Sequence, residues 1–182
     1  VYDGTDAALI ANLQANLTGA VNGDAVSLVS AKFNQADVVG AQLDYGAFGF
    51  SATDTSGKPV FGYSFGGAIT ATSMITPASL TVTGLSAVGR AYNGSAQIGL
   101  AGTGSLVGLV GSETLGLGDA SAATLSSANA GLRSITTALT LANGANGGLA
   151  ANYTLSQPLL GPVTITPASL TVTGLSAVGR AY

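Results

Sequence analysis

The side chains that perform most nucleophilic and metal-dependent enzyme chemistry are missing from this chain. It contains no histidine and no cysteine. Histidine is the usual general base for a serine or cysteine nucleophile, and thiolate and imidazole groups are the usual zinc ligands. Serine–histidine, cysteine–histidine and histidine–metal sites are therefore excluded within this chain. Carboxylates remain as the candidate reactive groups.

The carboxylates are concentrated in the first part of the chain. The aspartates there are Asp3, Asp6, Asp24, Asp37, Asp44 and Asp54, and only Glu113 and Asp119 follow. A glycosidase needs two carboxylates opposed across a cleft, whereas aspartate is also a common turn residue. The turn role is favoured, so we expect no enzymatic activity, no catalytic residue, no cofactor-binding residue and no cofactor.

Calcium is the metal to which these residue types are best suited. Hard oxygen ligands on loops between strands bind Ca²⁺, and Asp3, Asp6 and Asp24 are weak candidates for such a site. The chain has no DxDxDG loop, and its second half has few acids. We therefore expect no dedicated metal site.

The charge distribution excludes nucleic acid as a partner. The net charge is −3, and the five basic residues are scattered along the chain at Lys32, Lys58, Arg90, Arg133 and Arg180. No basic patch is available to neutralise phosphates. Polar residues or glycines interrupt every hydrophobic stretch before the roughly 18 residues that a membrane helix needs, so we also expect no membrane span.

The composition favours assembly. Only 7% of the residues are charged, against about 25% in ordinary soluble domains, and the mean hydropathy is +0.48. Such a surface is weakly charged, and exposed apolar area promotes association. Neighbouring copies of the same repeat or chain are the partners that we expect, in a head-to-tail fibre, with a host or abiotic surface as a further candidate.

An internal repeat organises the chain. The segment ITPASLTVTGLSAVGRAY at 75–92 recurs without change at 165–182, which sets an offset of 90 residues. The same offset relates other residues, and the repeat motif comprises Tyr2, Gly4, Tyr63, Pro77, Tyr92, Gly94, Tyr153 and Pro167. A period this long suits a complete small domain repeated along the chain.

Each repeat has the pattern of short β-strands. Leu80 and Val82 alternate with Thr81 and Thr83, and turn signals such as Asn93-Gly94 follow at short intervals. We predict an all-β fold of tandem small immunoglobulin-like β-sandwich modules arranged end to end, with β-grasp modules as the alternative. The aromatic residues of the segment 61–65 are expected core anchors.

The repeat boundary is predicted at the Ile-Thr-Pro joint, because proline disrupts strand pairing. The range 1–74 is then a first repeat without its opening strand, 75–164 is a complete second repeat, and 165–182 is the opening strand of a third. An unpaired strand beside apolar core is costly. Leu170, Val172 and Leu175 are therefore candidates for donation to a neighbouring module.

Several short motifs together resemble a known family. They are Val1-Tyr2-Asp3-Gly4-Thr5, Gly23-Asp24, Asn152-Tyr153-Thr154-Leu155 and Ile165-Thr166-Pro167. This combination resembles the YDG domain, a relative of the MBG repeats found in tandem in large bacterial adhesins of the filamentous-haemagglutinin, two-partner-secretion kind. The resemblance implies a spacer or adhesive repeat outside the cell or on the bacterial surface, with no catalytic activity.

The pattern departs from the family motif at three points. In the second repeat Asn93 replaces Asp3, and Ser112-Glu113 stands near the Gly-Asp position. In the first repeat Gly62 stands where the second has Asn152. Such exchanges argue against a fixed catalytic or metal role for these positions. Two functions stay open: a stalk module in a long covalent chain, and a filament subunit that polymerises by β-strand complementation.

Overall fold

The protein is all-β, as the alternating pattern predicts. The computed structural model describes residues 1–10, 17–64, 73–180 and 182. These residues form mostly short β-strands, with two 3-10 helices, η2 (Tyr45–Ala47) and η3 (Ala150–Asn152). Among the described residues, no helix has the length and apolar character needed to cross a bilayer.

The chain folds into two compact units that differ from the sequence repeats. Unit 1 contains Val1–Leu80, Gly108–Gly116 and Ala142–Leu155, and unit 2 contains Thr81–Val107, Leu117–Leu141 and Ser156–Tyr182. Three segments of the second repeat, 75–80, 108–116 and 142–155, therefore belong to the same unit as the first repeat.

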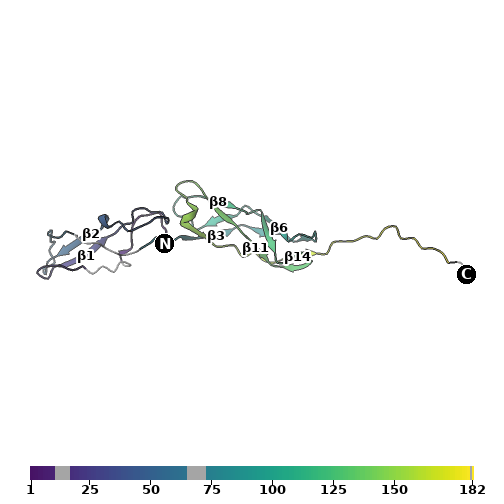
Figure 1. Cartoon of the computed structure of the whole chain (residues 1–182), viewed down its shortest axis with the longest axis horizontal. Helices are drawn as coiled ribbons and strands as arrows, with labels where there is room; N and C mark the ends of the chain where they lie inside the picture. Colours follow the sequence, from purple (N-terminus) through teal and green to yellow (C-terminus); the bar gives the residue numbers. More distant parts are fainter. Residues whose placement is uncertain (11–16, 65–72, 181) are drawn as a thin grey trace. The chain divides into compact units, whose positions relative to one another are not determined.

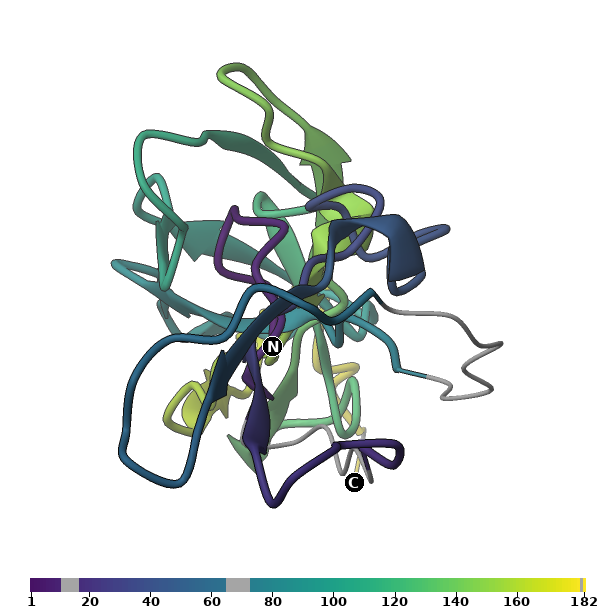
Figure 2. The ribbon, with the colours of Figure 1, turned by 90° about the vertical axis from the view of Figure 1, so that its left-hand side faces the viewer.

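Unit 1 is built around an antiparallel strand pair (Figures 1 and 2). β1 (Ala25–Ser30) pairs with β2 (Gly49–Thr53), and the register opposes Ala25 to Thr53. In the same unit, β13 (Tyr153–Leu155) lies parallel to the first half of β3 (Ala78–Thr83), with Leu155 opposite Leu80.

Unit 2 contains two small sheets around an apolar core. One sheet has the order β11-β9-β6-β4 and the other has the order β10-β14-β5. Their strands are β4 (Ser86–Ala87), β5 (Arg90–Ala91), β6 (Gln97–Ala101), β9 (Ala122–Leu125), β10 (Gly131–Arg133), β11 (Ile135–Thr136) and β14 (Val163–Thr166). The buried cluster consists of Ile98, Ala123, Leu125, Val163 and Ile165, and Ala87, Leu100 and Ile135 pack against it.

Three further strands lie outside these two sheets. β7 (Ser105–Val107) is antiparallel to the second half of β3, within unit 2. β8 (Leu115–Gly118) is a neighbour of β12 (Thr140–Asn143) in a two-stranded sheet. β14 ends at Thr166, two residues beyond the predicted boundary at residue 164.

The two repeats share a pattern of backbone hydrogen bonds. The N–H of Phe33 donates to Asp6, and the N–H of Leu125 donates to Ala96 in the same way. Tyr2 and Tyr92 donate to Thr76 and Thr166, respectively, at 2.7 and 2.8 Å. Two more such bonds, from Asn34 to Gln42 and from Ser126 to Ser134, also correspond. The repeat seen in the sequence is therefore also a repeat of local structure.

The expected alternation is present in β3. Leu80 and Val82 are buried, whereas Thr81 and Thr83 are exposed. The identical sequence near the C-terminus has a different environment, because residues 167–180 form no strand and Leu170 is 95% exposed. Alternation makes a strand suited to burial, and flanking strands such as β7 and β13 determine whether burial occurs.

One expectation about the core is wrong. Phe61 was expected to anchor a strand, but no strand forms at residues 61–64 and the side chain is 97% exposed. Tyr63 is half-buried, and its hydroxyl accepts the N–H of Val21. Residue 65 lies outside the described residues. Alternating aromatic residues require a neighbouring strand to become core, and none pairs with this segment in the described part of the chain.

Leu80→Ala is predicted to lower the free energy of unfolding by about 2–5 kcal/mol, since it leaves a cavity at a fully buried site. Leu170→Ala is the matched control, because it makes the same change in the same local sequence at an exposed position. Urea unfolding followed by circular dichroism measures both variants. Equal losses of stability would contradict the assigned burial.

Candidate interaction site

A tyrosine hydroxyl holds a tight turn in the first repeat. The turn runs from Val21 to Asp24, and Asn22 and Gly23 both have positive φ, at 55° and 76°. The hydroxyl oxygen of Tyr63 accepts the N–H of Val21 at 2.9 Å and donates to Asp24 Oδ2 at 2.8 Å. We call this arrangement of tyrosine, turn N–H and turn carboxylate a tyrosine clamp.

The second repeat contains the same tyrosine clamp. Its turn runs from Val110 to Glu113, and Gly111 supplies the positive φ of 55°. The hydroxyl oxygen of Tyr153 accepts the N–H of Val110 at 3.0 Å and donates to Glu113 Oε2 at 2.7 Å. The glutamate therefore performs the role that Asp24 has in the first repeat.

A second tyrosine completes the clamp at Glu113. The hydroxyl of Tyr2 donates a hydrogen bond to Glu113 Oε1, so that each carboxylate oxygen accepts a hydrogen bond from one tyrosine hydroxyl. The rings of Tyr2 and Tyr153 meet edge to face, with centroids 5.4 Å apart at an angle of 78°. Both side chains are buried, and edge-to-face aromatic pairs are favourable beyond the area that they bury.

Asn152, immediately before the clamp tyrosine, makes a further contact with the first repeat. Its side chain is fully buried; it accepts the N–H of Val38 at 2.9 Å and donates to Asp37 at 2.8 Å. A buried amide without partners would be costly, so these bonds fix its position. Gly62 stands at the corresponding position of the first repeat and cannot make them.

Burial and the carboxylate shift the acidity of the clamp tyrosines. Desolvation, followed by the hydrogen bond to Glu113 and its charge, raises the pKa of Tyr2 to about 12. Desolvation and the bond to Glu113 likewise raise the pKa of Tyr153. The N–H of Val21 lowers the pKa of Tyr63, but desolvation and Asp24 outweigh it, so the net shift is upward. All three hydroxyls are therefore held protonated, as donors.

The residues after Tyr2 and Tyr92 form equivalent turns. Asp3 Oδ1 accepts the N–H of Thr5 at 2.9 Å, and Asn93 Oδ1 accepts the N–H of Ser95 at 3.0 Å. Gly4 and Gly94 have φ values of 77° and 79°, which favour glycine. Because the turn uses one side-chain oxygen, aspartate and asparagine serve equally well.

The calcium candidates have separate partners. Asp3 accepts the N–H of Thr5 in its own turn, and Asp24 accepts a hydrogen bond from the hydroxyl of Tyr63. Asp6 forms a surface ion pair with Lys32 at 3.5 Å. Within the described residues, no three histidine, cysteine, aspartate or glutamate side chains gather as a metal site. The arrangement gives no support to calcium binding.

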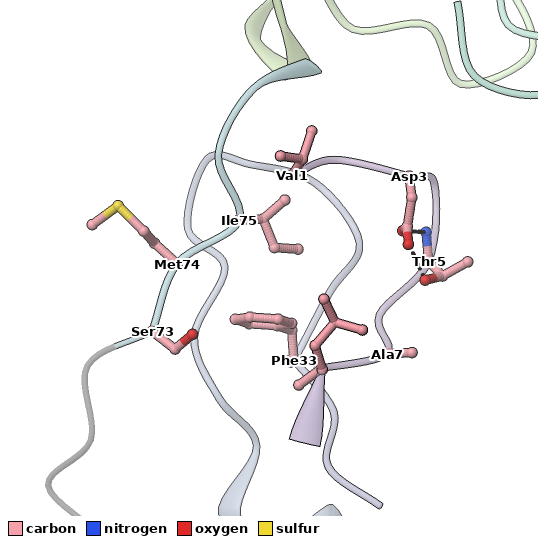
Figure 3. A pocket seen from close by; sticks show the side chains of 10 residues that line it. Val1, Asp3, Thr5, Ala7, Phe33, Ser73, Met74 and Ile75 are labelled. Carbon is pink, nitrogen blue, oxygen red and sulfur yellow. Dashed lines mark hydrogen bonds between the residues drawn. The ribbon is translucent and has the colours of Figure 1, made fainter. Parts of the chain in front are cut away.

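A pocket of about 190 Å³ lies in unit 1 (Figure 3). Its lining includes Val1, Ala8, Phe33 and Ile75, and the side chains of Phe33 and Ile75 face each other across it. By the hydrogen bonds that the repeats share, Phe33 corresponds to Leu125 of the unit 2 core. The pocket therefore occupies the place that packed side chains fill in unit 2.

Sequence reasoning identified the clamp tyrosines through their common offset but missed their carboxylate partners. Tyr2 and Glu113 are 111 residues apart, and no spacing rule connects them. The strand-donation candidates Leu170, Val172 and Leu175 are exposed, and donation stays a prediction. Pro77 directly precedes β3, and Pro167 directly follows β14.

Tyr2→Phe is predicted to lower the free energy of unfolding by about 1–3 kcal/mol, because it removes a buried hydrogen bond to a carboxylate. Tyr92→Phe changes the corresponding tyrosine, whose ring is 42% exposed, and is expected to alter stability by less than about 0.5 kcal/mol. Thermal or chemical unfolding distinguishes the two. The site is misassigned if Tyr92→Phe costs as much as Tyr2→Phe.

Alkaline pH is predicted to weaken the fold over a defined range. The folded-state pKa of Tyr2, about 12, exceeds its value of about 10 in an unfolded chain. Its contribution is therefore complete below pH 10 and is lost as the pH rises towards 12. Unfolding free energies measured from pH 8 to 12 should fall across this range, and the fall should be shallower for Tyr2→Phe. An identical decline in both proteins would contradict the assigned shift.

Comparison with known proteins relates one part of the chain to a family. No curated protein and no solved structure matches it. Residues 76–159, which include the clamp at Tyr153 and Glu113, match the family model of the YDG domain. This segment of the chain is similar to the YDG domain.

Proposed function

We propose that the chain is a non-catalytic structural repeat, a stalk or spacer, of a large secreted or surface-attached bacterial adhesin or extracellular fibre. The observation that carries this proposal is the recurrence of the same hydrogen bonds in the two repeats, such as Tyr2 to Thr76 and Tyr92 to Thr166. We also propose that the repeats are related to the MBG repeats of filamentous-haemagglutinin-type adhesins.

The contacts support a role in extension rather than in chemistry. The buried tyrosine hydroxyls and Asn152 are all engaged in bonds that hold turns or neighbouring loops. We take each repeat to be a small β-sandwich of immunoglobulin-like type. In such an array a segment of an adjoining repeat would fill the pocket of the first repeat.

The mass of the native protein tests this proposal. Antibodies raised against the 182-residue chain should detect, after boiling in detergent, a covalent species much larger than 17.6 kDa in extracts of the cells that encode it. A ladder that collapses to short subunits on boiling would contradict the covalent array and favour a polymer.

The pocket favours a second candidate function, a filament subunit joined by strand complementation. In unit 2, Ala87 of β4 packs against the core. A Cβ at Gly89 would collide with the backbone oxygen of Thr164, so the segment lies very close to β14. The counterpart of this segment in the first repeat would precede Val1. Residues 175–179 have the same sequence, LSAVG, as residues 85–89.

The occupant in this case is the tail of another copy. Leu175 is 87% exposed and Ala177 is exposed, and they match Leu85 and Ala87, which are half-buried in the segment beside the unit 2 core. The tail therefore has the apolar side chains, and at Gly179 the glycine, that the equivalent place requires. Docking there would form a head-to-tail fibre that does not close.

The double variant Leu175→Asp, Ala177→Asp is predicted to abolish any concentration-dependent association of the chain in sedimentation experiments, since charges on the tail cannot enter an apolar pocket. Leu159→Asp is the matched control, because Leu159 is fully exposed outside the tail. Association that survives in the double variant, or a monomer at every concentration, would contradict the filament candidate.

A further inference from the structure

We propose that Tyr2, Glu113 and Tyr153 form a lock between consecutive repeats and that every repeat carries both halves of it. The donor half is the tyrosine at positions 2 and 92, and the receiver half is the tyrosine clamp. Tyr92 is then the donor for the next repeat, and Asp24 with Tyr63 receives the tyrosine of the preceding one. This inference rests on the proposed function as a repeat array.

The complete lock is seen once, within unit 1. The first repeat contributes Tyr2, and the second repeat contributes Glu113 and Tyr153. The bond from Asn152 to Asp37 links the same two repeats. The lock therefore involves a buried charge-assisted hydrogen bond, a ring contact and an amide, which together are specific for a neighbouring repeat.

The receiver half in the first repeat is built but incomplete. Asp24 Oδ2 accepts a hydrogen bond from the hydroxyl of Tyr63, as Glu113 Oε2 does from that of Tyr153. In the second repeat the other oxygen of Glu113 accepts a hydrogen bond from the hydroxyl of Tyr2. No hydrogen bond reaches the other oxygen of Asp24 from the described part of the chain, so it is available for a tyrosine from another repeat.

The donor half at Tyr92 is also built. Its N–H donates to Thr166 as that of Tyr2 donates to Thr76, and an equivalent turn follows each tyrosine. The ring of Tyr92 is 42% exposed, against 5% for Tyr2, and its hydroxyl has no hydrogen bond to the described residues. The two tyrosines share a backbone setting and differ in whether a receiver half is present.

The two receiver halves differ in strength. Asp24 is one methylene shorter than Glu113, and Gly62 replaces Asn152. The lock at Asp24 therefore lacks the amide bonds that accompany Glu113. We expect a tyrosine to be held less tightly there than at Glu113.

A chain with three repeats tests the lock. Because 165–182 repeats 75–92, a second copy of residues 93–166 added after Tyr182 completes a third repeat. Nitration of tyrosines with tetranitromethane, quantified by mass spectrometry, reports their accessibility. Tyr92 should react about tenfold more slowly in the extended chain than in the 182-residue chain. Tyr182, which becomes the donor with no receiver, should stay reactive.

A matched variant identifies the receiver. Glu113→Ala in the added copy alone should restore the reactivity of Tyr92, while the same change in the original copy should expose Tyr2 instead. The counterpart of Tyr153 in the added copy reports whether the added repeat folds. If this tyrosine is protected from nitration like Tyr153 but Tyr92 reacts as fast as before, the lock is wrong and the repeat array stands. An added repeat that does not fold counts against the array.

A double-mutant cycle in the 182-residue chain judges the lock even if the added repeat does not fold. Tyr2→Phe and Glu113→Gln should each lower the folding equilibrium constant by some factor. The double variant should lower it by a factor at least about threefold smaller than the product of those two factors, because both substitutions remove the same interaction. The same cycle with Tyr92→Phe in place of Tyr2→Phe should be additive. Additivity in the first cycle would overturn the lock.

Discussion

A buried tyrosine hydroxyl needs a hydrogen-bond partner, and this requirement organises the connection between the repeats. The hydroxyl of Tyr153 accepts a hydrogen bond from a turn N–H and donates one to Glu113, and that of Tyr63 does the same with Val21 and Asp24. Each turn has a residue with positive φ that directs its N–H and its carboxylate to one hydroxyl. Because a carboxylate has two oxygens, one clamp can also accept the tyrosine of another repeat.

Burial in this protein is decided by neighbours as much as by sequence. The same residues form the core strand β3 at 78–83 and an exposed tail at 168–173. Leu80 is fully buried and lies opposite Leu155 of β13, whereas Leu170 is exposed and belongs to no strand. A low-charge chain with such a tail is suited to contact further repeats, in a covalent array or in a polymer.

The sequence predicted the features that depend on local pattern. The alternation of Leu80 and Val82 with threonines indicated β3, and the offset of Tyr63 and Tyr153 indicated equivalent positions. It did not predict the bond from Tyr2 to Glu113 or the bonds of Asn152 to residues 37–38, because these depend on which repeats come together. Glu113 looked like a departure from the Gly-Asp pattern, yet it preserves the acceptor that the clamp needs. Phe61 shows the converse error, since its pattern suited a core that no neighbouring strand provides.

Amide hydrogen exchange of two backbone groups tests the repeated clamp most directly. The account predicts that Tyr63→Phe accelerates exchange of the Val21 N–H and leaves that of Val110 unchanged, because only the Val21 group loses its hydroxyl acceptor. Tyr153→Phe should have the opposite pattern. Exchange rates of both amides that do not respond to either substitution would contradict the claim that a tyrosine hydroxyl holds each turn.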